Sequence, residues 1–307
     1  MLTRECMKGV YVIIPTPFDR NAVFLEDHFR LNVRRLCEIG IHAIVTTGGQ
    51  GEFHSIPWEA HKRLIRALAE ETAGTQTVSV VGCSGVHTEE TIERTQYAQE
   101  CGIDAAMNVS PYYVELTHRE LVEFWRDLAQ ACPNIGLVIY NNATTGQLHD
   151  FAAYQEISKI PTVCGSKEGH HNFALLYRLL RETDLAIMTP LEQFYFVPSM
   201  QLGAKGIFSM TAAMCPYFIL NFYETCKRGD WEQATQMQIA LQEMWQKLDS
   251  LEMLKGYHAI PRFKAIVNGF GFLKCGVTRR PFIPVPDEIQ KRLTDYIRDE
   301  FSEYIIS

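Results

Sequence analysis

The sequence has no apolar stretch that approaches the roughly 18 residues needed to span a membrane. Its first ten residues, MLTRECMKGV, also lack the apolar core and the small-residue cleavage site of a secretion signal. Basic residues form no stripe, because 29 Lys and Arg are interspersed with 36 Asp and Glu, for a net charge of −7. These absences argue against a membrane protein or a nucleic-acid binder, and we expect a cytoplasmic chain.

The sequence patterns of disulfide, metal and dinucleotide sites are missing as well. Nine cysteines are spread from Cys6 to Cys275 without a C-x-x-C pair, which favours reduced thiols over a disulfide framework or a zinc site. There is no HExxH motif and no close carboxylate–histidine pattern, and His61 is expected on the surface of a helix. The glycines near Gly269 miss the G-x-G-x-x-G spacing of a dinucleotide loop. We therefore predict neither a metal nor a cofactor.

What the chain does contain is a repeated alternation of short β-prone runs and segments with helical spacing. Its 307 residues, 47% of them hydrophobic, can bury a large core as one domain or as two. Thr117 and Glu120 form a capping-box pattern, and Ser55 followed by Pro57 marks another helix start. The β-prone runs cover residues 10–14, 43–47, 77–81, 105–109, 136–140, 163–166, 185–188 and 206–209.

Eight apolar strands alternating with helices predict parallel pairing with both faces of the sheet covered. We therefore expect an α/β fold, a (β/α)8 TIM barrel with a C-terminal helical extension, in preference to an open doubly wound sheet. Residues 1–230 would form the barrel and carry the active site. Residues 231–307, with helical segments at 231–254, 261–268 and 286–307, would pack on it, since no low-complexity linker separates the two parts.

A lysine stands at the end of the sixth run. In a barrel of this kind, chemistry sits where the strands end, because the following loops converge on one face. The stretch TVCGSKEGHH places Lys167 at that face, and the fifth run ends at Tyr140. Partial desolvation would lower the pKa of the lysine, so that a neutral amine could form a Schiff base with a ketone while the phenol moves protons. By itself, a lysine at a strand end is more often a solvated rim charge, and a tyrosine there often packs its ring in the core.

The second run ends in TTGGQGEF, where three glycines surround Gln50. Main-chain N–H groups in this turn could cradle the carboxylate of a 2-oxo acid, so Gly49, Gln50 and Gly51 are candidate substrate-binding residues; alternatively, the glycines only form a turn. Glu192 is expected either to cap the helix after the seventh strand or to face the substrate. Other loops carry polar candidates for contacts with the distal part of a substrate: His54, Thr144, Thr145, Gln193 and Ser209.

Taken together, the motifs at the strand ends resemble the dihydrodipicolinate synthase and N-acetylneuraminate lyase family of class I, Schiff-base-forming pyruvate aldolases. The resemblance covers residues 9–212 and implies that Lys167 forms an imine with pyruvate while Tyr140 shuttles protons. Tyr113 would reach into the site of a neighbouring subunit, in a homotetramer built from tight dimers; Tyr112 and Tyr113 could equally pack at a subunit contact. The motifs are G-E at Gly51, PYY at Pro111, YN at Tyr140 and G-x-KE at Gly165.

Two departures from the family pattern bear on the substrate. Gly49 and Gln50 stand where the family usually has two hydroxyl residues, and the segment YNNATTG lacks the arginine that binds a second carboxylate in the synthase branch. The resemblance therefore favours reversible cleavage of a 4-hydroxy-2-oxo acid, such as a 2-keto-3-deoxy sugar acid, to pyruvate and an aldehyde.

Several alternatives stay open from the sequence. They are a dehydratase, a hydratase-aldolase acting on benzylidenepyruvates, a 4-hydroxy-tetrahydrodipicolinate synthase and a non-catalytic 2-oxo acid sensor, with a metal-dependent aldolase as the mechanistic rival. The presence of both Lys167 and Tyr140 argues against a sensor, since simple recognition requires neither an imine nor a proton shuttle.

Overall fold

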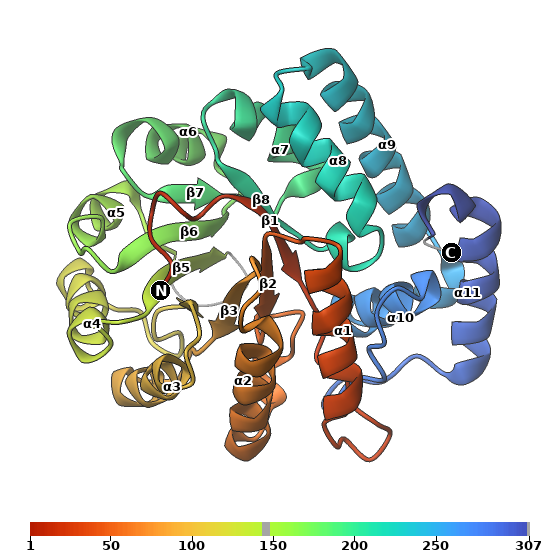
Figure 1. Cartoon of the computed structure of the whole chain (residues 1–307), viewed down its shortest axis with the longest axis horizontal. Coiled ribbons are helices and arrows are strands. Elements are labelled where there is room, and N and C mark those ends of the chain that lie inside the picture. Colours follow the sequence, from red (N-terminus) through yellow and green to blue (C-terminus); the bar gives the residue numbers. More distant parts are fainter. Residues whose placement is uncertain (143–147, 306–307) are drawn as a thin grey trace.

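The chain forms a barrel of parallel strands surrounded by helices (Figure 1). The computed structural model describes residues 1–142 and 148–305, and in them one sheet has the strand order β7-β6-β5-β4-β3-β2-β1-β8. A bridge between Thr189 and Ile207 brings the β7 end against β8, so that the sheet nearly closes on itself. The predicted (β/α)8 fold is confirmed. The strands are β1 (Gly9–Ile13), β2 (Ala43–Thr46), β3 (Val78–Gly82), β4 (Ala105–Asn108), β5 (Gly136–Asn142), β6 (Val163–Gly169), β7 (Ala186–Met188) and β8 (Gly206–Ser209).

A helix follows each strand, as the alternation of patterns predicts. The Thr117–Glu120 capping box forms at the start of α4. The helices of the barrel are α1 (Glu26–Glu38), α2 (Trp58–Thr72), α3 (Thr88–Glu100), α4 (His118–Ala131), α5 (Phe151–Ile157), α6 (Phe173–Glu182), α7 (Glu192–Gln201) and α8 (Pro216–Lys227). Short 3-10 helices occur at η1 (Phe53–Ser55), η2 (Thr211–Ala213), η3 (Glu252–Leu254) and η4 (Ser302–Tyr304).

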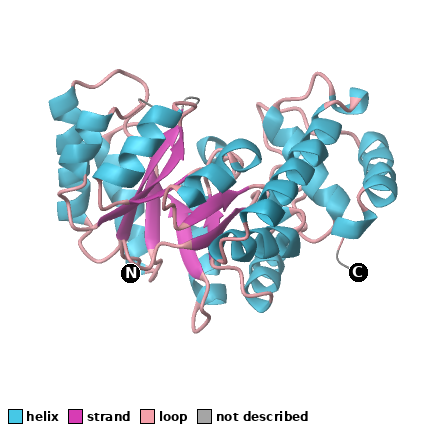
Figure 2. Ribbon diagram, turned by 90° about the horizontal axis from the view of Figure 1, so that it is seen from above, coloured by secondary structure: helices cyan, strands magenta, loops and turns pink. Residues whose placement is uncertain are grey.

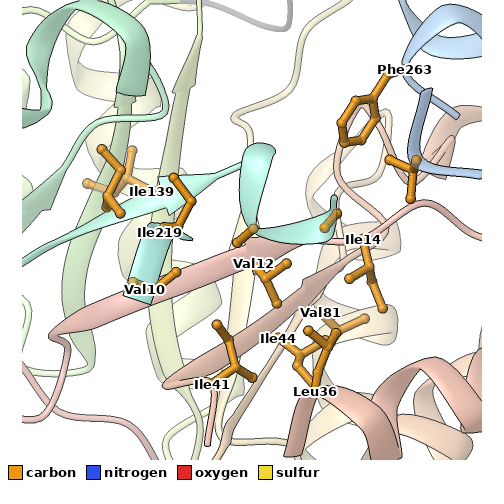
Figure 3. Packing of buried hydrophobic residues seen from close by; sticks show 14 of the residues in the cluster. Val10, Val12, Ile14, Leu36, Ile41, Ile44, Val81, Ile139, Ile219 and Phe263 are labelled. Atoms are coloured by element: carbon orange, nitrogen blue, oxygen red, sulfur yellow. The ribbon is translucent and has the colours of Figure 1, made fainter. Parts of the chain in front are cut away.

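The strands are buried on both faces, which explains why they read as continuous apolar runs. In β1 every residue is buried. Tyr11 and Ile13 belong to a cluster that fills the barrel, whereas Val10 and Val12 pack outward beneath the helices. Figure 3 shows this outward cluster, in which side chains from successive strands meet those of the covering helices.

Strands β5 and β6 extend further than the sequence indicates. The predicted runs stop at residues 140 and 166, whereas the strands continue to Asn142 and Gly169. These extensions contain polar residues, so they do not continue the apolar runs from which the strands were predicted. Within the pair, Asn141 lies opposite Glu168 and their side chains form a hydrogen bond, so that both stay satisfied while buried. Lys167 therefore lies inside a strand and not after its end.

The C-terminal helices gather at one side of the barrel, next to the end marked C in Figure 2. Helix α9 (Trp231–Asp249) packs against α7 and α8, while α10 (Ala259–Phe270) and α11 (Asp287–Glu300) pack on each other. In the described part of the chain, no helix combines the length and apolar character of a membrane span.

His61 corrects one expectation from the sequence. It lies in α2 as expected, but it is buried and not on the surface, with its ring against Trp58. Burial lowers the pKa of His61 to about 3, helped by the nearby charge of Arg94. His61 lies on the face of the amphipathic helix that packs against the protein core. A polar residue on that face interrupts the apolar pattern, so the sequence alone suggested that it was exposed.

Candidate active site

The pairing of β5 with β6 places Tyr140 directly opposite Lys167. Because side chains alternate along a strand, both point into the barrel, while the next pair, Asn141 and Glu168, points outward. The Lys167 Nζ lies 4.1 Å from the centre of the Tyr140 ring, and the lysine is only 4% exposed. The structure thus brings together the two residues for which the sequence predicts imine and proton chemistry.

The hydroxyl of Tyr140 has a polar environment inside the barrel. Asn142 Nδ2 donates to it over 3.1 Å, and the Gly49 main chain also forms a hydrogen bond with it. Burial acts to raise the pKa of Tyr140, but the charge of Lys167 and these hydrogen bonds outweigh it and lower the pKa below its usual value. The phenol is therefore a stronger acid than a free tyrosine. Asn142 was missed in the sequence, although its place two residues after Tyr140 put it on the same face of the strand.

The turn after β2 has a constrained backbone. Thr47 and Glu52 both adopt left-handed conformations, with φ of 51° and 60°. The Thr47 hydroxyl accepts from the N–H of Gly82 over 2.9 Å and donates to the Gly82 carbonyl over 3.0 Å, which fixes the start of the turn. A Cβ on Gly51 would lie 2.5 Å from the Thr47 nitrogen, so only glycine fits there. Strained residues held in this way often mark a functional loop.

Only part of the predicted carboxylate cradle faces the cavity. The N–H groups of Gly51 and Glu52 donate to the carbonyls of Gly48 and Gly49 and thereby close the turn. Gly49 and Gln50 line the cavity, whereas Gly51 serves to form the turn. The Gln50 Oε1 is buried and has no hydrogen-bond partner among the described residues. The side chain of Gln50 therefore carries an unsatisfied hydrogen-bond acceptor next to the cavity.

Glu52 anchors this turn to the C-terminal segment. Its carboxylate is completely buried and lies 2.5 Å from Lys264 Nζ of α10. The other carboxylate oxygen accepts the main-chain N–H of Arg279 over 2.8 Å. Lys264 also donates to the carbonyls of Thr16 and Val277. From the sequence, Glu52 has no evident role beyond the G-E motif, because its partners Lys264 and Arg279 lie more than 200 positions away.

A second buried carboxylate supports the strand that carries Lys167. Glu168 accepts hydrogen bonds from Asn141 Nδ2 at 3.0 Å and from the Tyr154 hydroxyl at 2.6 Å. Burial raises the pKa of Glu168 despite these hydrogen bonds. Tyr154 belongs to α5, so this network joins β5 and β6 to the helix that covers them.

These residues border a cavity of about 750 Å³ at the mouth of the barrel. Tyr140, Lys167, Gly49 and Gln50 lie at its base, and the predicted His54 also lines it. The remaining lining residues are Ile13, Phe53, Tyr112, Asn142, Gly169, His171, Pro190, Leu191, Met210, His258, Ala259, Ile260 and Phe282.

Other predicted site residues lie elsewhere. Tyr113 is 85% exposed and does not line the cavity, although its neighbour Tyr112 does. The Ser209 hydroxyl is fully buried and donates to Glu192, so it does not face the cavity. Gln193 does not line it either. Thr144 and Thr145 lie outside the described residues.

Glu192 has a structural role that differs from the expected helix cap. It is the first residue of α7, but its carboxylate accepts the N–H groups of Met210 and Thr211 over 3.1 and 2.8 Å, and so holds the segment after β8. Burial raises the pKa of Glu192 in spite of its hydrogen bonds from Ser209 and Thr211. It does not line the cavity.

The arrangement has the parts needed for imine chemistry on a small oxo acid. A buried amine, an acidified phenol and a polar turn meet at the base of a cavity large enough for a second substrate. Among residues 1–142 and 148–305, no cluster of three or more His, Cys, Asp or Glu is arranged to hold a metal ion.

Comparisons with known proteins identify relatives across the whole chain. Residues 6–300 match the model of the Dihydrodipicolinate synthetase family. A 4-hydroxy-tetrahydrodipicolinate synthase of Methanosphaerula palustris is 29% identical over 305 residues, covering 97% of this chain and 99% of the relative. The enzyme of the same name from Methanospirillum hungatei is 26% identical over 304 residues, with the same shares covered. Among solved structures, a catalytic lysine mutant of Ruminococcus gnavus sialic acid aldolase has a similar fold, with a TM-score of 0.86, 21% identity, and coverage of 99% of this chain and 100% of that one.

Proposed function

Because this chain belongs to the dihydrodipicolinate synthetase family and is an enzyme of that family, we propose that it is a Schiff-base lyase that reversibly cleaves a 4-hydroxy-2-oxo acid to pyruvate and an aldehyde. The sequence favours a 2-keto-3-deoxy acid as the substrate. One observation carries the proposal: the amine of Lys167 and the phenol of Tyr140 lie together, buried, at the base of the cavity.

The proposed reaction begins at the lysine. The amine of Lys167 adds to the keto carbon, and loss of water leaves an iminium ion. When the 4-hydroxyl loses its proton, the C3–C4 bond breaks, its electron pair forms the enamine, and the aldehyde departs. Protonation of C3 and hydrolysis of the iminium then release pyruvate and restore the amine. Tyr140 is placed to donate and accept protons on oxygen during these steps.

The proposed carboxylate site is the Gly49–Gln50 part of the turn. Gln50 lines the cavity, and in the proposal its main-chain N–H and side-chain amide would bind the carboxylate in place of the hydroxyl groups that the resemblance would supply. The left-handed residues on either side keep this turn in one conformation, so binding requires little further ordering.

Reductive trapping tests the nucleophile. Borohydride added with pyruvate should reduce the imine and fix a pyruvate-derived adduct on Lys167, which peptide mass spectrometry would locate. Lys167→Ala should abolish the adduct, whereas Lys159→Ala should retain it, because Lys159 is a surface lysine whose side chain is 69% exposed. An adduct on another residue, or none with the folded wild-type chain, would refute the proposal.

Condensation of pyruvate with aspartate semialdehyde is the second candidate function, because both reported relatives are named as synthases. That substrate brings a carboxylate, yet Lys167 is the only lysine among the described cavity residues and no arginine is found among them. The segment 143–147, with sequence ATTGQ, supplies no cation either. We expect aspartate semialdehyde to be a poor co-substrate in a coupled pyruvate-consumption assay. Robust condensation would reverse this ranking.

Dehydration through the same imine would give a different product. A dehydratase releases water and keeps the carbon skeleton whole, whereas the proposed lyase releases pyruvate. The product mass from a 2-keto-3-deoxy acid therefore separates the two reactions.

The assembly and the compartment are also proposals. Tyr112, Tyr113 and Val114 form an exposed apolar run, 38%, 85% and 61% exposed, which suits a contact between subunits in the homotetramer that the resemblance implies. Light scattering of the purified chain would measure the assembly. The nine cysteines are free thiols in the structure, which supports a cytoplasmic location.

A further inference from the structure

One wall of the cavity is a continuous series of aromatic rings. Tyr112 meets Phe53 edge to face at 6.5 Å between ring centres, and Phe53 meets His54 at 5.7 Å. His54 in turn meets Phe282 at 5.4 Å, and Phe282 stacks on His258 at 4.8 Å. All five side chains line the cavity that holds Lys167. We call these five residues the aromatic wall.

The aromatic wall comes from three separate segments of the chain. Tyr112 follows β4, Phe53 and His54 follow β2, and His258 and Phe282 belong to the C-terminal segment beyond the barrel. The barrel therefore supplies the amine and the phenol, while residues from outside the barrel supply part of the cavity lining.

A single buried carboxylate joins two of these segments. Glu52 directly precedes Phe53 and His54. One of its oxygens binds Lys264 of α10, the helix whose N-cap is His258, and the other accepts the N–H of Arg279, three residues before Phe282. Through these two contacts, Glu52 in the turn after β2 helps to hold the segments that carry His258 and Phe282 in place.

The chemistry of the wall favours an uncharged, flat group. The ionisable groups among the described cavity residues are Lys167, the histidines, and the phenols of Tyr112 and Tyr140. Burial lowers the pKa of His54, which keeps that imidazole neutral near pH 7. Aromatic rings bind other rings by offset stacking and edge-to-face contact, whereas a polyhydroxylated chain needs many convergent hydrogen-bond partners.

We propose that the aromatic wall binds the aldehyde half of the substrate, and that this half is an uncharged aryl group and not a polyhydroxylated chain. The inference rests on the proposed function, because it concerns the second substrate of the same site. It keeps the 4-hydroxy-2-oxo acid of the proposed function but replaces the sugar acid that the resemblance favours with a substrate whose cleavage releases an arylaldehyde.

Competing aldehydes provide the test. Pyruvate consumption is measured with benzaldehyde and with glyceraldehyde for the wild type and for Phe282→Ala, Phe282→Leu and Phe194→Ala. The wild type should prefer benzaldehyde, with a kcat/KM at least about tenfold higher. Phe282→Ala should reduce this preference about tenfold, and Phe282→Leu, which keeps most of the volume but removes the ring, should also reduce it.

Phe194→Ala is the matched control, because Phe194 is an aromatic residue on α7 that is 54% exposed and outside the cavity lining. It should keep the wild-type preference. A wild type that prefers glyceraldehyde, or Phe282 variants with an unchanged preference, would overturn the assignment of the wall.

Failure of the proposed function would look different. In that case borohydride would trap no pyruvate adduct in the wild type, and neither aldehyde would react. Benzyl alcohol, which cannot form an imine, tests the wall separately: its saturation-transfer NMR signal should be strong with the wild type and with Lys167→Ala, and weak with Phe282→Ala. Equal signals from the wild type and Phe282→Ala would count against the wall even if the lyase reaction is present.

Discussion

At Tyr140, burial and local charge act in opposite directions on the same phenol. Burial would make the phenol a weaker acid, whereas the ammonium of Lys167 and the hydrogen bonds from Asn142 and Gly49 stabilise the phenolate. The second effect is larger, so the pKa lies below the ordinary value of 10. A group tuned in this direction is better matched to proton transfer near neutral pH.

The corresponding prediction concerns Tyr140→Phe. Removing the hydroxyl should lower kcat by about 100-fold or more, since positioned proton transfer contributes on that scale. A protonated phenol acts as an acid only below its pKa, so the wild-type pH–rate profile should fall on its alkaline side at a pKa below 10. This limb should be absent in Tyr140→Phe and present in the control Tyr177→Phe, whose ring is 48% exposed. An identical alkaline limb in Tyr140→Phe would assign it to another group.

The turn after β2 and helix α10 depend on each other through a buried ion pair. Burial lowers the pKa of Lys264, and the charge of Glu52 offsets only part of this effect. The turn itself carries two left-handed residues, so its conformation needs support from outside. A contact between Glu52 and Lys264 supplies that support across the boundary between barrel and C-terminal helices.

Lys264→Met should therefore be strongly destabilising. The change keeps an apolar stem of similar size but leaves Glu52 buried without its cation, which should cost about 3–5 kcal/mol of unfolding free energy. The double variant Glu52→Gln/Lys264→Met should recover much of this loss, because a neutral amide can still accept the Arg279 N–H. Urea unfolding measures all three chains. A double variant that is less stable than Lys264→Met would contradict the argument.

On the scale of the whole molecule, two buried histidines make stability depend on pH. Burial lowers the pKa of His149 to about 4 and that of His61 to about 3. An unfolded chain returns each to its ordinary value of 6.5, so between these values the unfolded state binds more protons. The stability that comes from burying the histidines in their neutral form is present in full above pH 6.5. It declines as the pH falls toward their pKa values in the folded state.

Comparison of the wild type with His149→Gln isolates this effect. The pKa of Glu168 is raised in the folded state, so its contribution to the unfolding free energy changes with pH in the opposite direction to that of the histidines. Because both proteins contain Glu168, this contribution cancels in the comparison. The introduced amide would still offer an acceptor to Trp125 Nε1, which donates to His149 over 3.0 Å. When the pH is lowered from about 7 to about 4.5, the free energy of unfolding measured with urea should fall less in His149→Gln than in the wild type. The two decreases should differ by about 2–3 kcal/mol. Parallel pH profiles would show that His149 is not responsible.

The sequence by itself determined the barrel and the positions of the proposed catalytic pair, Lys167 and Tyr140. Eight apolar runs alternating with helical segments leave few arrangements that bury both faces of a parallel sheet, and each of the eight runs overlaps a strand. Because functional residues of such a barrel stand at strand ends, Lys167, Tyr140 and the Gly49–Gln50 turn could be singled out as candidates from their positions, and the family resemblance suggested their roles.

Only the tertiary structure decided what surrounds that pair. Glu52 meets Lys264 and Arg279 across more than 200 positions, and the aromatic wall joins His54 to Phe282 across a similar distance in the sequence. Ser209 looks like a site residue in the sequence, but its hydroxyl is held by Glu192. Local patterns follow from the periodicity of strands and helices, whereas these contacts depend on how distant segments pack, and no local pattern records that packing.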